Sequence, residues 1–148
     1  MATAIITALL AVLVFVFTQS FLKPALEPIQ EQKKLMGEVA HALLFYANVF
    51  YVGRGELKNE HRREELEEAR KVLQGLAGRL RTSLWTVPFY DTLARLGLVP
   101  KKEDVLEAST QLVGWSNSLY DRGGDENLNK RLTIIADRLG ITKRLEAS

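Results

Sequence analysis

The first charged side chain of this sequence is Lys23, and the residues from Ala2 to Leu22 carry no charge. As one helix rising ~1.5 Å per residue, they would extend roughly 31 Å, close to the thickness of the hydrocarbon core of a bilayer. A secretory signal peptide would need a basic residue before the apolar run and a small-x-small cleavage site after it, and neither is present. The sequence therefore predicts that residues 1–23 form a retained transmembrane anchor.

Basic residues lie on one side of this segment only. Lys23, Lys33 and Lys34 follow it closely, and no basic residue precedes it. Because basic residues beside a transmembrane helix favour the cytoplasmic side, we expect the rest of the chain to face the cytoplasm. The predicted location is the cell membrane, crossed once.

Small residues recur on one face of the anchor. Ala4, Ala8 and Ala11 share this face, and Thr3 and Thr7 lie beside it. Small residues let two helix backbones approach closely in lipid, so this face is a predicted site of self-association.

The remainder of the chain has the composition of a soluble domain. All 20 basic and 18 acidic residues of the 148 follow Leu22, and the net charge is +2. A charge this small does not indicate nucleic-acid binding. The absence of cysteine excludes disulfides and thiolate metal sites. About 126 residues are enough for one small domain with a modest core.

Two prolines mark the boundary between the anchor and this domain. Pro24 and Pro28 each disfavour helical geometry in the residue before them, which predicts a bend or break over residues 24–28 at the membrane surface. A second helix is then expected from Pro28 to about Val52.

The second helix is apolar on nearly every face from Val39 to Val52. About 14 residues are too few to span a bilayer, so we expect this run to be buried on all sides, by this chain or by another copy of it. Two interpretations stay open for His41 and Asn48: a partly solvated face, or buried polar groups that fix which helices pair. The predicted interaction residues of the anchor and the second helix are Ala4, Ala8, Ala11, Met36, Val39, His41, Leu43, Tyr46, Asn48 and Phe50.

Apolar residues three and four apart predict three further long helices, and no strand-like alternation is present. The expected helices run from Glu56 to about Arg81, from Glu103 to Tyr120, and from Asp125 or Asn127 through Leu139. The predicted fold is all-α: a single N-terminal transmembrane helix followed by a cytoplasmic helical bundle of about four helices over residues 29–148.

An aromatic segment interrupts this pattern. Pro88 is expected to begin a short helix that ends at Leu96, with Gly97 as its left-handed cap. The segment either returns to the bilayer surface or packs across the end of the bundle. On the first interpretation the residues at the membrane interface are Lys23, Trp85, Phe89 and Tyr90.

Three motifs suggest chemistry, and each is incomplete. Glu38 and His41 are half of a dimetal carboxylate site, and the only other histidine has no glutamate three residues before it. Residues 64–68 match the Glu-Glu-x-x-Glu string of all-α nucleotide pyrophosphohydrolases, which the chain resembles only there. A possible first half of a helix-turn-helix ends near Thr142, too close to the end of the sequence for a recognition helix.

The expected function is therefore protein–protein interaction, without a cofactor or a metal. We expect a membrane-anchored scaffold or accessory subunit that contacts the lipid bilayer. Its protein partner is expected to be another copy of this chain, an unidentified membrane protein, or both. The alternative is a small homo-oligomeric pore or transporter subunit, with a path lined by Thr3, Thr7, Thr18 and Gln19. An enzyme is the third possibility.

Overall fold

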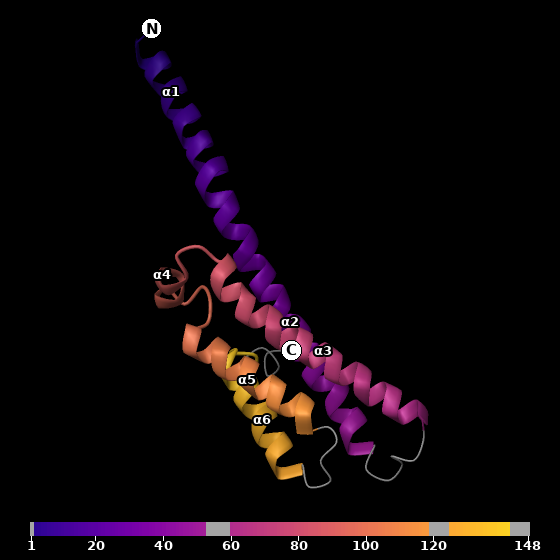
Figure 1. The fold of residues 1–148 in the computed structure, drawn as a ribbon. Coiled ribbons are helices and arrows are strands. Elements are labelled where there is room, and N and C mark those ends of the chain that lie inside the picture. Colours follow the sequence, from indigo (N-terminus) through magenta and orange to yellow (C-terminus); the bar gives the residue numbers. More distant parts are fainter. Residues whose placement is uncertain (1, 53–59, 119–124, 143–148) are drawn as a thin grey trace.

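The computed structural model describes residues 2–52, 60–118 and 125–142 (Figure 1). Within these ranges every regular element is a helix, which confirms the predicted all-α class. The elements are α1 (Ala2–Phe17), the π-helix η1 (Thr18–Leu22), α2 (Lys23–Val52), α3 (Glu60–Thr86), α4 (Tyr90–Arg95), α5 (Lys102–Ser118) and α6 (Asp125–Arg138).

The first three elements form one long rod (Figure 1). The sequence predicts a bend or a break over residues 24–28, and no break is found there, since α2 begins at Lys23 and continues through Pro28. Proline lacks an N–H group, and its ring would clash with the carbonyl four residues earlier in an α-helix. The turn ahead of Pro24 is the π-helix η1, so the chain accommodates this proline by widening the turn.

The predicted transmembrane helix is not supported as a single α-helix. Among the described residues, no helix combines the length and the apolar character that are needed to cross a membrane. The predicted span is divided, since α1 is 16 residues long and the five residues of η1 follow it.

Four helices, α2, α3, α5 and α6, surround the main core of the domain. α3 packs against both α2 and α5, and α6 packs against α5. The apolar stripes that the sequence predicts on α3 and α5 are confirmed as buried as far as the structure describes them: Leu66, Ala69, Leu73, Leu76 and Leu80 on α3, and Val105, Ala108, Leu112 and Trp115 on α5. Except for Leu66 and Ala69, these side chains form one core cluster with Val39 and Leu43 of α2, Ile135 of α6, and Leu139, which follows α6.

A second, smaller core holds α4 against the rest of the bundle. It consists of Ile29 of α2, Val87, Tyr90 and Val99, with Leu84 packed against both cores. Because Leu84 extends the apolar stripe of α3, that helix ends at Thr86 rather than near Arg81 as predicted. The predicted start at Glu56 lies outside the described residues.

Two helices end in the same motif. Gly97 after α4 and Gly140 after α6 have φ angles of 71° and 65°. In each case the N–H of the following apolar residue donates to a carbonyl five residues back, Leu98 to Leu93 and Ile141 to Ala136. This is the Schellman arrangement that the two Leu-Gly-apolar sequences predict.

Alanine at Gly97 or Gly140 should destabilise the domain by about 1 kcal/mol each, because a side chain disfavours positive φ. Gly75→Ala is the matched control. This glycine lies inside α3 with open space around the added methyl group, so alanine should stabilise the helix by up to ~1 kcal/mol. Urea denaturation of the full chain in detergent, followed by circular dichroism, measures all three. Equal destabilisation by all three substitutions would contradict this account.

Candidate interaction surfaces

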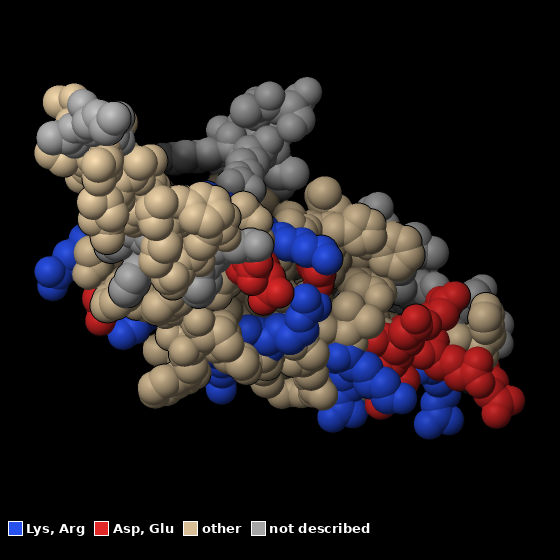
Figure 2. Space-filling view, turned by 90° about the horizontal axis from the view of Figure 1, so that it is seen from above, with Lys and Arg blue, Asp and Glu red and all other residues tan. Residues whose placement is uncertain are grey.

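The surface of α1 is apolar in every direction. Its nine large apolar residues from Ile5 to Val16 each expose between 51% and 64% of their surface, and α1 projects away from the bundle (Figure 1). Seen from the end from which α1 projects, the described surface of the bundle carries both Lys or Arg and Asp or Glu side chains (Figure 2). The apolar segment is thus distinct from the charged bundle.

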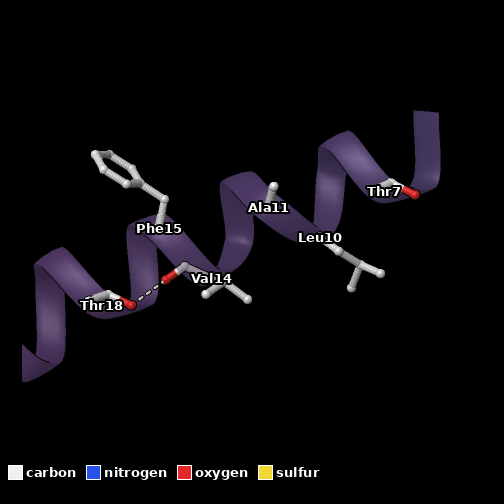
Figure 3. Close-up of a pocket in the computed structure, with 6 residues that line it drawn as sticks. All are labelled: Thr7, Leu10, Ala11, Val14, Phe15 and Thr18. Atoms are coloured by element: carbon white, nitrogen blue, oxygen red, sulfur yellow. Dashed lines mark hydrogen bonds between the residues drawn. The ribbon is translucent and has the colours of Figure 1, made fainter. Parts of the chain in front are cut away.

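A shallow hollow lies on one side of α1 (Figure 3). The residues that line it come from α1 and from the first position of η1: Thr7, Leu10, Ala11, Val14, Phe15 and Thr18. Ala11 leaves space between larger neighbours, and Ala8 of the predicted alanine face is also exposed. The side chain of Ala4 lies outside the described residues. A second surface could therefore fill this hollow without displacing any described element.

Both threonine hydroxyls of the hollow are hydrogen-bonded within the helix. The hydroxyl of Thr7 donates to the carbonyl of Thr3 at 2.9 Å, and that of Thr18 donates to the carbonyl of Val14 at 2.7 Å (Figure 3). Because the hydroxyl protons already have acceptors, these side chains need no donor bond to water.

The outer face of α2 carries an exposed patch. Leu44 and Phe45 are each more than half exposed, and the exposed His41 ring stacks on Phe45 with centroids 5.9 Å apart. The expectation that the apolar run from Val39 onward is buried on all sides is therefore wrong for this chain by itself. One face packs on the core, and the opposite face is uncovered.

The other predicted interaction residues of α2 divide between the core and side chains that lie outside the described residues. Val39 and Leu43 are buried within this chain, and Met36 and Tyr46 pack partly buried against the same core. The side chains of Asn48 and Phe50 lie outside the described residues. Of the predicted set on α2, His41 is thus the described residue that remains accessible.

Sequence reasoning did not include Leu44 and Phe45 among the interaction residues. Their signal is positional, because they lie three and four residues after His41 and so share its helix face. Because the run is apolar on nearly every face, its sequence does not show which face is exposed.

Glu38 is not available as a metal ligand. Its carboxylate pairs with the Arg79 guanidinium of α3, and that hydrogen bond holds the pKa of Glu38 below its ordinary value. No three histidine, aspartate or glutamate side chains come together as metal ligands would in the described part of the chain. Of the acidic string at residues 64–68, Glu65 lies 3.6 Å from His61 and Glu67 lies 3.8 Å from Arg70.

The aromatic segment before α5 divides into exposed and buried rings. Trp85 and Phe89 are exposed, whereas Tyr90 is buried in the smaller core. The side chain of the fourth predicted interface residue, Lys23, is not described. Leu96 and Leu98, which sequence reasoning did not include, are exposed beside α4.

A buried polar contact joins α2, α3 and α4. The side chain of Gln32 is 1% exposed, and its amide nitrogen donates to the Tyr90 hydroxyl at 2.8 Å and to the Ser83 hydroxyl at 3.2 Å. The Ser83 hydroxyl in turn donates to the carbonyl of Leu80 at 2.7 Å. Burial raises the pKa of Tyr90 above its usual 10.0, and the Gln32 hydrogen bond opposes this shift. We refer to Gln32, Ser83 and Tyr90 as the polar lock.

Comparison with protein families, curated proteins and solved structures finds no match to this chain.

Tyr90→Phe should destabilise the bundle by about 1–3 kcal/mol, because it removes an acceptor from a buried amide. The double variant Gln32→Leu/Tyr90→Phe should cost less than the two single changes together, since it leaves no amide in need of a partner. Tyr46→Phe, on a partly buried ring of α2, is the control and should change stability little. Additive costs in the urea midpoints would contradict a hydrogen bond between the two side chains.

The lock also predicts a pH dependence. The folded state holds the Tyr90 proton more tightly than the unfolded chain does, so this stabilisation is fully present below about pH 10 and is lost as the pH rises through the folded pKa. Tyr90→Phe should therefore reduce the loss of stability between pH 8 and about pH 11. The remaining slope includes Tyr46, whose pKa burial also raises. An unchanged slope in the variant would show that Tyr90 titrates as an exposed phenol does.

Proposed function

We propose that this protein is a membrane-anchored helical scaffold or accessory subunit that acts through protein–protein interaction and associates with copies of itself. The apolar segment of α1 and η1 crosses the bilayer once, and the bundle faces the cytoplasm, where Lys33 and Lys34 follow the anchor. The observation that carries this proposal is the exposure of large apolar side chains on all sides of α1.

Exposure of this kind is costly in water. Burying one large aliphatic or aromatic side chain stabilises a protein by about 1.5–3 kcal/mol, and nine such side chains of α1 each expose at least 51% of their surface. A helix that is apolar all round occurs inside a large core or inside a membrane. Because α1 projects away from the bundle and contributes no residue to either described core, we favour the membrane (Figure 1).

The length of the uncharged segment fits this environment when α1 and η1 are taken together. The 16 residues of α1 alone extend about 24 Å, which is shorter than the ~30 Å hydrocarbon core. The five uncharged residues of η1 bring the segment to roughly that thickness. The widened turn would then lie near the headgroups of the cytoplasmic leaflet.

The threonines of the apolar segment favour an anchor over a pore. A water path lined by Thr7 and Thr18 would have to compete with the bonds that their hydroxyls make to Thr3 and Val14. In lipid those intrahelical bonds satisfy the hydroxyl protons at no further cost.

Self-association is supported by the patch of His41, Leu44 and Phe45 on α2. Anchored copies share one orientation in the membrane, so the same face of α2 is presented at the same height by each copy. Apolar side chains that protrude from such a face gain by burial against one another. The hollow of α1 around Ala11 offers a second contact on the same rod.

Two arginines in the middle of α1 should prevent anchoring. Leu9→Arg/Leu13→Arg places charges at the bilayer centre, where each costs about 2.5–3.5 kcal/mol or more. Flotation of the full chain with liposomes measures the bound fraction, which should fall strongly. Leu106→Arg, on the exposed surface of α5, is the control and should float as the parent does. Equal flotation of all three proteins would contradict membrane insertion of α1.

Serine at two positions of the α2 patch should weaken self-association. Leu44→Ser/Phe45→Ser removes at least ~1.5 kcal/mol of apolar burial per side chain if both are covered in the assembly, which is more than a tenfold change in affinity. Cross-linking in liposomes should then shift from oligomer towards monomer. Leu106→Ser is the matched control and should leave the pattern unchanged. If the double variant cross-links as the parent does, α2 is not the contact.

A further inference from the structure

The most exposed large apolar side chains of the described chain are not on α1. Trp85 is 89% exposed and Phe89 is 81% exposed, and Leu96 and Leu98 are exposed close by in the sequence. We call these four side chains the foot. They lie around α4, between the end of α3 and the start of α5.

The backbone of Phe89 is in a conformation that a phenylalanine rarely adopts. Its φ and ψ angles of 53° and 36° are left-handed, and it is the one residue other than glycine with a positive φ in the described ranges. This conformation costs about 1–2 kcal/mol for a residue with a side chain. Within this chain the Phe89 ring recovers little of that cost, because it is almost fully exposed. Strain of this kind points to a use outside the fold of the single chain.

The foot is carried by the smaller core of Ile29, Val87, Tyr90 and Val99, which we call the platform. Tyr90, next to Phe89, is buried, and its hydroxyl accepts the hydrogen bond from Gln32 of α2. Val87 and Val99 are buried on the two sides of α4. Through Gln32 the platform is attached to the same helix that continues into η1 and α1, so the foot and the anchor hold fixed positions relative to each other.

The platform lies at the end of the bundle from which α1 projects (Figure 1). The surface at this end of the bundle carries both signs of charge, and basic side chains lie close to the platform in the sequence. Asp91 is the one acidic residue between Leu84 and Val99, and its carboxylate pairs with Lys102 at 3.0 Å. Arg95 and Lys101 are exposed nearby. Tryptophan and other aromatic rings favour the headgroup region, and basic residues there attract anionic lipids.

From these observations we propose that the foot is a second membrane contact. Trp85, Phe89, Leu96 and Leu98 insert into the boundary between headgroups and acyl chains of the leaflet that faces the bundle. The inference rests on the proposed function, because α1 brings the platform to the bilayer. With two contacts, the bundle is held at one orientation against the membrane instead of turning about a single helix.

The two tryptophans of the chain provide the test. Trp85 is on the foot, whereas Trp115 is 0% exposed in the main core. The full-length variant Trp115→Phe, reconstituted in liposomes of phosphatidylcholine and phosphatidylglycerol, reports on Trp85 alone. Its emission should shift to shorter wavelength and lose most of its intensity when the acyl chains carry bromine near the headgroup. Bromine near the bilayer centre should quench it less.

The variant Trp85→Phe, which retains Trp115, is the control and should be quenched little by either lipid. If Trp115→Phe does not fold, the parent protein serves instead, and the quenching should disappear when Trp85 is replaced. Flotation of the same liposomes separates the two proposals. A protein that floats while Trp85 emits as it does in water overturns the foot and leaves the anchor standing. A protein that does not float overturns the anchor itself.

A blue-shifted Trp85 that no brominated lipid quenches would overturn the lipid contact, because it would show that protein covers the foot. Phe89→Gly adds a second measurement. Glycine adopts the left-handed conformation freely, so the variant should unfold at the same or a higher temperature than the parent in detergent. It should nevertheless weaken quenching of Trp85 in liposomes, since one apolar side chain of the contact is missing. Unchanged quenching would exclude Phe89 from the contact.

Discussion

The continuity of α1, η1 and α2 is the constraint on which the rest of the structure depends (Figure 1). One part of this rod supplies a wall of the main core through Val39 and Leu43, and the other part projects from the bundle as a helix without a packed face. The apolar α1 therefore cannot change direction without moving the bundle. The π turn contributes to this continuity, because it lets helical structure continue past Pro24, and α2 then continues through Pro28.

Within the bundle, α3 and the polar lock have different roles. The buried stripe of α3 packs against α2 and α5 and supplies apolar burial, which is strong and has no preferred direction. The hydrogen bonds from Gln32 to Tyr90 and Ser83 add direction, because they form only when α2, α3 and α4 are in one arrangement. Burial thus stabilises the bundle, and the lock fixes the position of the exposed rings Trp85 and Phe89 relative to α2.

The sequence predicted the parts of this fold whose causes are local. The stripes of α3 and α5 follow from spacings of three and four, and the ends at Gly97 and Gly140 follow from a short motif. The helix through Pro28 was not predicted, because it depends on a widened turn that no residue pattern announces. The open face at Leu44 was missed because a run that is apolar all round does not show which side is covered. The residue pattern does not tell which of two adjacent aromatics is buried, whereas the structure buries Tyr90 and leaves Phe89 exposed with a positive φ angle.

The central claim is that this protein works as a membrane-bound assembly, and the mass of the complex ejected directly from native membranes tests it most directly. The account predicts a lipid-associated complex that contains at least two copies of the 16.7 kDa chain, alone or with an additional protein. In the first case the assembly is a homomeric scaffold, and in the second the chain is an accessory subunit. A mass of one bare chain, or recovery of the protein only outside the membrane fraction, would contradict the account.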